Sequence, residues 1–252
     1  MLDETCLLES LENNVLTLTM NRMARHHALN ADLIGALGNA IDRAERDDEI
    51  KVVVLTGAGE KSFCAGADML EASGIENPDA PNTSISASKL QERFLHSPVP
   101  IIAAINGYCY GGGAWLAIAC DIRFGGSNAT FRLPGCEYGL VVAAATLPRL
   151  VGSAKAKEWI YSARKFDAEE AFEFGLLNSV HKPENLMSAT YELAQQIAAN
   201  SAPAVRECKR IINMASLSDE AAAQEVASNE ILRGSPEQVE RFVAATKKVT
   251  GR

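Results

Sequence analysis

Two stretches of small residues follow apolar, β-branched runs, and both are candidates for chemistry. The first extends from Lys51 to Met69 and contains Ala65–Asp68, and the second extends from Ile101 to Asp121 and contains the triple glycine Gly111–Gly113. Small residues allow two backbone segments to approach closely, and the first amides of a helix lack acceptors and carry partial positive charge. The pattern predicts backbone N–H groups that can bind an oxyanion.

Other uses of glycine after a strand fit the triple glycine less well. The run from Gly111 to Leu116 lacks the third glycine of a dinucleotide fingerprint, and no lysine follows a glycine as in a phosphate-binding loop. A glycine turn with a purely structural role stays open as an alternative, because spacing alone does not distinguish it from an oxyanion site.

The elements that must position these stretches alternate between strands and helices. The patterns predict strands at Val15–Met20, Lys51–Thr56 and Ile101–Ile105 and an amphipathic helix at Ala31–Asp47. Further elements are expected at Gly113–Cys120 (helix), Asp121–Phe124 (strand), Ser153–Ala163 (helix) and Asp167–Phe174 (helix). Such alternation favours an α/β fold.

The last quarter of the chain is helical in pattern. Four helices are expected, at Asn185–Ala199, Pro203–Met214, Asp219–Leu232 and Pro236–Lys247. In contrast, Ala72–Ser88 contains two prolines, four serines and a threonine and shows no helical period, which predicts a loop, either a lid or a solvated excursion.

Composition excludes several classes of function. A net charge of -8 argues against nucleic-acid binding, which needs a basic surface. The acidic start is unlike a secretory signal and no apolar run is long enough to span a membrane, so a cytoplasmic location is expected. The six cysteines and four histidines are scattered, which predicts neither a disulfide framework nor a metal site.

Several motifs together resemble the crotonase (enoyl-CoA hydratase/isomerase) superfamily in order and spacing. They are Asn21–Arg22 with Ala28–Asn30, Phe63–Asp68, Ile105–Tyr108 with Gly111–Gly113, Cys120–Arg123, Phe131–Pro134, Arg149–Gly152 and Ala168–Leu176. The resemblance covers nearly the whole chain. It implies an α/β fold, a crotonase (ClpP-like) spiral of ββα turns over residues 1–195, with a helical trimerisation region at 196–252. It also implies a trimer or a dimer of trimers.

The same resemblance implies an acyl-CoA thioester as the ligand, with no cofactor beyond the coenzyme A of the substrate. The backbone amides of Ala67 and Gly112 would bind the thioester carbonyl oxygen, where enolate chemistry accumulates negative charge. The residues expected to border coenzyme A are His27, Ala28, Ala65, Asp68 and Met69. Asp68 also has a structural interpretation, because a short acid before a helix can cap its amides.

The residues expected for hydration are missing. Hydratases of this family carry glutamates where this chain has Trp115 and Gly135, and a third position that is acidic in some relatives holds Ala143. Hydration needs one group to activate water and another to protonate the α-carbon, and neither indole nor glycine can do so.

The loop after Pro134 supplies the remaining ionisable candidates. Glu137 can act as a relocated base beside an apolar wall, or it can form a surface salt bridge; Tyr138 can orient a carboxylate or protonate an enolate. Cys136 fits packing better than nucleophilic catalysis. The expected acyl pocket consists of Trp115, Pro134, Gly135, Cys136, Leu140 and Ala143.

The sequence therefore leaves three possible functions. The first is an enzyme that stabilises a thioester enolate for isomerisation or related chemistry at the α-carbon. The second is an enoyl-CoA hydratase with atypical acid/base residues, and the third is a catalytically silent acyl-CoA-binding subunit.

Overall fold

The larger of two β-sheets is built from apolar, β-branched strands. In the computed structural model, which describes residues 5–77 and 83–251, this sheet has six strands. Their order is β1 (Leu7–Glu12), β2 (Val15–Met20), β3 (Val52–Gly57), β5 (Ile101–Ile105), β7 (Ile122–Gly126) and β10 (Ser179–His181). Only β1 runs antiparallel to its neighbour, so the sheet is parallel from β2 onward.

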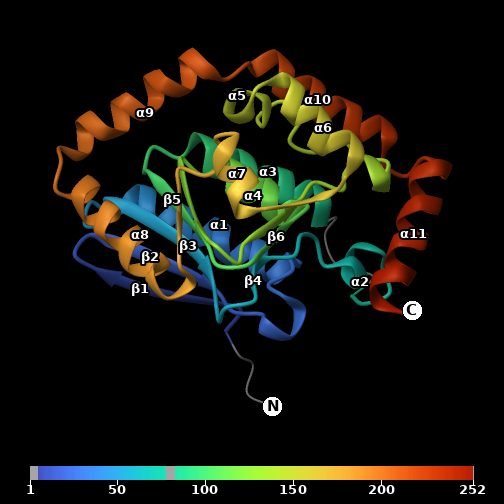
Figure 1. Ribbon diagram of the computed structural model, residues 1–252, viewed down its shortest axis with the longest axis horizontal. Coiled ribbons are helices and arrows are strands. Elements are labelled where there is room, and N and C mark those ends of the chain that lie inside the picture. Colours follow the sequence, from blue (N-terminus) through green and yellow to red (C-terminus); the bar gives the residue numbers. More distant parts are fainter. Residues whose placement is uncertain (1–4, 78–82, 252) are drawn as a thin grey trace.

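The chain advances as a spiral, since each turn sends one strand to the large sheet and the next strand to a smaller one. The small sheet has the order β4 (Ser62–Cys64), β6 (Tyr108–Tyr110), β8 (Thr130–Arg132) and β9 (Lys165–Asp167). Helices complete each turn: α2 (Met69–Ala72) and α3 (Thr83–His96) follow β4, α4 (Gly112–Ala119) follows β6, and α5 (Pro148–Val151) and α6 (Ser153–Ser162) follow β8. The expected ββα spiral is confirmed (Figure 1).

The core lies on both faces of the large sheet because its strands are buried on both sides. Along β3, Val53 and Leu55 belong to the main cluster with helices α1 (Ala31–Arg46), α3 and α4. Val52 and Val54 point the other way, into a second cluster under α8 (Pro183–Ala198). Alternate side chains of a strand face opposite sides, so one apolar run supplies both layers.

A buried arginine fixes the C-terminal end of α4. Arg123 donates to the carbonyl oxygens of Cys120 at 2.5 Å and Leu176 at 2.8 Å. Burial lowers the pKa of Arg123 to about 10, and the helix carbonyls around it favour the cation. Because a helix moves as a rigid unit, fixing the C-terminal end of α4 also holds its N-terminal end in place.

The helical tail consists of α9 (Ala202–Ser216), α10 (Asp219–Leu232) and α11 (Pro236–Thr250), which arc over the spiral and end beside α2 (Figure 1). The first helix of the tail is anchored by Lys209 of α9. This residue pairs with Asp121 at 2.8 Å and donates to the carbonyl of Val99 at 3.0 Å. No helix in the described ranges is long and apolar enough to cross a membrane. The predicted division at residue 195 falls inside α8.

Most predicted elements are confirmed. The loop prediction for 72–88 is confirmed for residues 73–77, which form turns and bends, and is wrong for residues 83–88, which are helical. Helix α3 begins at Thr83, and residues 78–82 lie outside the described part. The buried residues Leu90 and Phe94, one turn apart, anchor this helix to the core. Because extending a helix costs little once it is nucleated, the helix continues backward to Thr83 without a helical period there. The three-residue strands of the small sheet were not predicted because a period of two needs longer runs to be visible.

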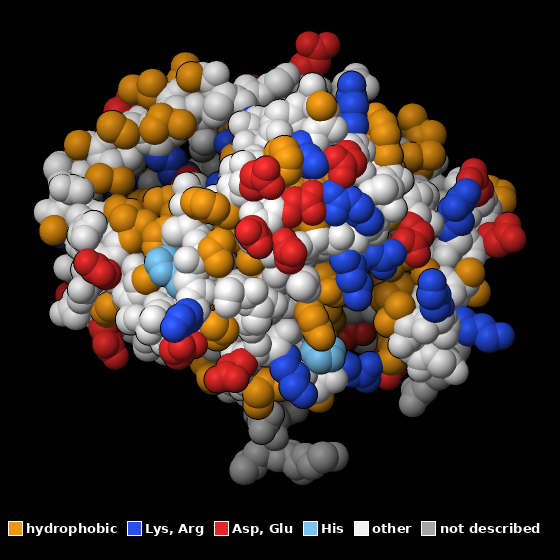
Figure 2. Space-filling view, viewed as in Figure 1, with side chains coloured by type: hydrophobic (Ala, Val, Ile, Leu, Met, Phe, Trp, Pro, Cys, Tyr) orange, Lys and Arg blue, Asp and Glu red, His pale blue; other side chains and the backbone are white. Residues whose placement is uncertain are grey.

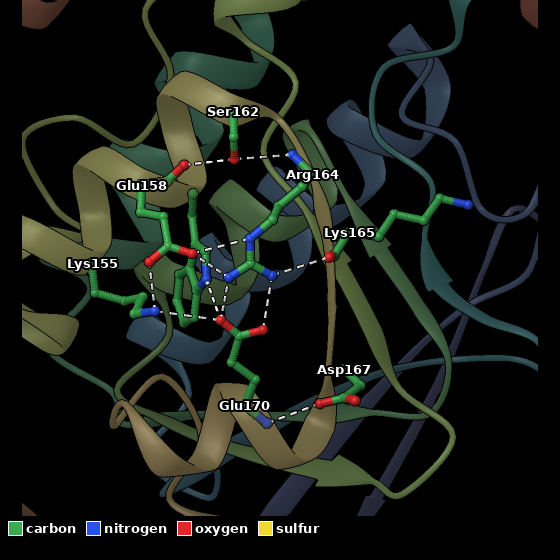
Figure 3. A network of polar contacts seen from close by, with 8 residues as sticks. Lys155, Glu158, Ser162, Arg164, Lys165, Asp167 and Glu170 are labelled. Atoms are coloured by element: carbon green, nitrogen blue, oxygen red, sulfur yellow. Dashed lines mark hydrogen bonds and ion pairs between the residues drawn. The ribbon is translucent and has the colours of Figure 1, made fainter.

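A polar network joins α6 to α7 (Ala168–Glu173) beside the small sheet (Figure 3). Arg164 donates to Glu170 at 2.8 Å, the indole N–H of Trp159 donates to the same carboxylate at 3.0 Å, and Lys155 lies 3.5 Å from it. The hydrogen bonds from Arg164 hold the pKa of Glu170 down to about 2. The network therefore fastens the two helices at neutral pH.

We predict that Glu170→Gln lowers the free energy of unfolding by about 1 kcal/mol at neutral pH. The folded pKa lies below the ordinary value of 4.5, so the stabilisation is present above pH 4.5 and is lost as the pH falls toward about 2. Urea titrations at several pH values should show the difference between wild type and variant shrinking over that range. The exposed neighbour Glu169, changed to Gln, is the control, and a pH-independent difference would contradict the prediction.

Candidate active site

The amides of Ala67 and Gly112 lie side by side where the first spiral turn meets the second. A Cβ placed on Gly66 would lie 3.3 Å from the nitrogen of Gly112, and one on Gly112 would lie 3.6 Å from the nitrogen of Ala67. Both residues are half-buried, so the pair is accessible to a ligand. This is the arrangement expected of two donors to one oxygen.

Neighbouring hydrogen bonds leave both amides without a partner among residues 5–77 and 83–251. Leu29 forms a parallel bridge with Ala67, using the carbonyl of Gly66 at 2.7 Å and the amide of Asp68 at 2.9 Å. These bonds use the residues on either side of Ala67, so its own N–H points away from Leu29. Gly112 is the first residue of α4, where an N–H has no acceptor within the helix and lies at the positive end of its dipole.

The glycines are required because two backbone segments touch here. A Cβ on Gly113 would lie 2.3 Å from the carbonyl oxygen of Cys64, which no side chain can occupy. Gly66 and Gly111 have φ of 103° and 52°, in the region that favours glycine. The triple glycine is thus required by packing, and its second member carries a helix-terminal amide on a half-buried residue.

Two of the residues expected to border coenzyme A have structural partners of their own. The ring of His27 accepts from the amide of Arg22 at 3.0 Å and pairs with the carbonyl of Ala58 at 3.0 Å, and burial lowers its pKa, so it is a neutral, internal side chain. Asp68 accepts from the amide of Leu70 at 3.3 Å as the N-cap of α2. The capping interpretation of Asp68 is therefore confirmed.

Arg22 joins these segments, and the sequence reasoning assigned it no role. Its guanidinium pairs with Asp68 at 2.9 Å and donates to the carbonyl of Ala28. It thereby holds residues 22–29 against the segment of Ala67, while Ala65 and Met69 flank that segment half-buried. Asn21–Arg22 is one of the motifs that resemble the family, and this match is the feature of the sequence that could have pointed to Arg22.

The three positions where acids are missing have different surroundings in the structure. A Cβ on Gly135 would lie 3.0 Å from the carbonyl of Leu140 and 3.1 Å from the Cβ of Val142, so the loop is closed over this position. Ala143 is fully buried with a φ of 61°. Trp115 has a buried indole N–H without a hydrogen-bond acceptor in the described residues.

The ionisable side chains predicted on the loop face partners other than a substrate. Glu137 pairs with Arg132 and is 37% exposed, so its carboxylate is not enclosed as a base of raised pKa would need, and the salt-bridge interpretation fits. Tyr138 packs edge-on against Phe242 of α11, and burial raises the pKa of its hydroxyl. Cys136 is exposed, and partial burial of its thiol raises the pKa, which opposes a nucleophilic role.

The helical tail holds this loop from outside, an arrangement that no sequence pattern predicts. Asn229 of α10 accepts from the amide of Val141 at 2.8 Å and donates to the carbonyl of the same residue. Glu225 accepts from the amide of Ala145 at 2.7 Å, and Gln238 of α11 packs on Gly139. The wall that contains Pro134, Leu140 and Ala143 is thus shaped by helices that follow it by 80 residues or more.

Comparisons with known proteins agree with this geometry. The family model described as enoyl-CoA hydratase/isomerase matches residues 10–243. A short-chain-enoyl-CoA hydratase of Clostridium acetobutylicum is 38% identical over 80% of this chain and 78% of its own length. A carnitinyl-CoA dehydratase of Salmonella enteritidis is 38% identical over 75% of this chain and 72% of its own.

Solved structures show the same fold over almost the whole chain. An enoyl-CoA hydratase/isomerase from Pseudoalteromonas atlantica is 30% identical with a TM-score of 0.87, covering 96% of this chain and 97% of that one. An enoyl-CoA hydratase from Bacillus anthracis is 32% identical with a TM-score of 0.79 and covers 96% of each chain.

We predict that Gly113→Ala destabilises the fold by about 1 to 3 kcal/mol, because its methyl group would overlap the carbonyl of Cys64. The matched control is Gly35→Ala on the exposed side of α1, where a Cβ meets nothing within 4 Å and should stabilise the helix by up to about 1 kcal/mol. Thermal unfolding of both variants measures the difference. Equal stability of the two would contradict the close contact.

Proposed function

The chain belongs to the enoyl-CoA hydratase/isomerase (crotonase) family, and from this premise we propose that it stabilises a thioester enolate to move a proton, or release a carboxylate, at the α-carbon. The single observation that carries the proposal is the pair of free amides at Ala67 and Gly112. The substrate is an acyl-CoA thioester, as the family implies.

The chemistry follows from where charge develops. Removing a proton, or losing carbon dioxide from an α-carboxylate, leaves the bonding electron pair on the α-carbon and moves charge onto the thioester oxygen, and two fixed N–H donors stabilise that charge without reorganising. The positive end of the α4 dipole acts in the same direction. Backbone donors do not depend on side-chain identity, so this half of the mechanism is independent of the substitutions at Trp115 and Gly135.

A second candidate, hydration of a 2-enoyl-CoA, is favoured by the printed names of relatives such as the Clostridium acetobutylicum hydratase. It is the weaker proposal, because Trp115 donates only and Gly135 has no side chain, with even a Cβ in tight contact with Leu140 and Val142. A silent acyl-CoA-binding subunit would bind thioesters and turn none of them over.

We predict that the protein isomerises a short-chain 3-enoyl-CoA and exchanges the α-protons of a saturated acyl-CoA in deuterium oxide faster than it hydrates a 2-enoyl-CoA. Ultraviolet absorbance and proton NMR measure the three rates. Fast hydration without exchange would support the second candidate instead. Binding without turnover of enoyl or malonyl-type thioesters would support the silent subunit.

We predict that Ala67→Pro, which deletes one donor, lowers the rate of proton exchange by about 100 to 1,000-fold. Ala67→Gly keeps the amide and is the matched control, expected to retain most activity. Circular dichroism establishes that both variants fold. Full activity in a folded Ala67→Pro variant would show that this amide is not part of the site.

We further propose that the chain assembles as a trimer or a dimer of trimers through its helical tail. Apolar side chains at Ile211, Ile212 and Met214 of α9 are exposed, and Figure 2 shows hydrophobic side chains gathered over that helix at the upper left. Exposed apolar patches of this kind commonly mark interfaces between proteins.

The expected solution mass is that of three or six chains, measured by light scattering coupled to size exclusion. Ile212→Asp should shift the mass toward the single chain, because a charge would be buried at the interface. Leu8→Asp on the edge strand β1, also exposed, is the control. A single-chain mass for the wild type would overturn the assembly proposal and leave the oxyanion site untouched.

A further inference from the structure

Two polar side chains of α10 reach the loop that forms one wall of the site, and they differ in how their atoms are used. Asn229 and Glu225 lie one turn apart on the same helix face. Both polar atoms of Asn229 are bound to the backbone of Val141. Glu225 accepts from the amide of Ala145 with one oxygen, and the residue is only 7% exposed. Its other oxygen is buried and makes no hydrogen bond of ordinary geometry within the described residues, although the amides of Ala143 and Ala144 lie close enough to lower the pKa of the carboxyl.

Backbone contacts connect Glu225 to the oxyanion amides. The amide of Gly111 donates to the carbonyl of Arg132 at 2.9 Å, and a Cβ on Gly111 would lie 3.9 Å from Pro134, so Pro134 stands directly beside the triple glycine. The loop then doubles back, placing Val142 against Gly135. Glu225 binds the turn directly after Val142, so its carboxyl contacts the same loop whose start, at Pro134, lies beside the triple glycine.

Other polar atoms near this wall also lack partners. The hydroxyl of Thr146, 4% exposed and next to Ala145, has no hydrogen-bond partner among the described residues. The indole N–H of Trp115, one helical turn after Gly112, is also buried and has no hydrogen-bond partner among the described residues. Buried polar groups are nearly always satisfied, so unpaired groups on this loop and on the helix of Gly112 are groups that a ligand can satisfy.

Resting on the proposed function, we propose that Glu225 is the acid/base residue that moves the proton in the enolate reaction. Its carboxylate takes a proton from the α-carbon, and the C–H electron pair moves through the thioester onto the oxygen held by Ala67 and Gly112. The carboxylic acid then returns the proton to the γ-carbon, where the electron pair forms the new C–H bond. The carboxylate is regenerated, and no other reactant is needed.

The surroundings of Glu225 suit this role better than those of the other carboxyls near the site. Burial raises the pKa of Glu225, while the backbone amides of Ala145, Ala143 and Ala144 lower it in part, so the group is a stronger base than a solvated glutamate. Glu137 is engaged with Arg132, and Asp68 with Arg22. Of these three carboxyls in the described part of the chain, only that of Glu225 has a buried oxygen without a hydrogen bond of ordinary geometry.

The test compares Glu225→Gln with wild type for proton exchange of butyryl-CoA in deuterium oxide and for isomerisation of a short-chain 3-enoyl-CoA. Glutamine keeps an oxygen that can accept from the amide of Ala145, so the loop should stay in place while the acid/base group is lost. The expected loss is about 100 to 10,000-fold in rate, with unchanged thioester affinity and melting temperature. Glu230→Gln, exposed on the same helix, is the matched control and should keep wild-type rates.

The outcomes separate the two proposals. If wild type exchanges protons and Glu225→Gln does so equally well, Glu225 is not the base and the proposed function stands. If wild type shows no exchange with any thioester, both proposals fail. Should the Gln variant unfold, Glu225→Asp gives the answer: partial activity supports a carboxyl role, and wild-type activity with a shortened carboxyl overturns it.

Discussion

The direct contact between two backbone segments, Cys64–Ala67 and Gly111–Gly113, is the constraint on which the rest of the structure depends. No side chain separates them, since a Cβ on Gly113 would overlap the carbonyl of Cys64. The contact brings the start of α4 against the segment after β4, and it aligns one helix-terminal amide with one amide from an irregular strand. Any residue larger than glycine at this point would separate the two donors.

Two arginines hold the segments that meet at this contact. Arg123 binds carbonyls at the C-terminal end of α4, so the helix cannot shift along its axis without breaking buried hydrogen bonds. Arg22 pairs with Asp68 and with the carbonyl of Ala28, and so fixes the segment that carries Ala67. Preorganised donors stabilise charge because they need not move, and these two cations supply that rigidity.

The other half of the site has a different origin, because its wall is shaped by the helical tail. Gly139, Val141 and Ala145 are each contacted by a residue of α10 or α11. A tail that holds the wall can also bring chemistry to it. The acid/base group proposed on α10 would compensate for the carboxylates absent at Trp115 and Gly135, while the oxyanion amides remain those of the spiral.

The sequence by itself determined four strands of the large sheet, most helices and the two residues proposed as oxyanion donors, because period, glycine spacing and ordered motifs are local properties of the chain. It placed the candidates Glu137 and Tyr138 close to the site because they are near it in sequence. Only the tertiary structure decided that Glu137 pairs with Arg132, that Val142 occupies the space at Gly135, and that Glu225 reaches Ala145 across 80 residues. Such long-range contacts depend on how helices pack over the finished spiral, and no pattern within one segment encodes them.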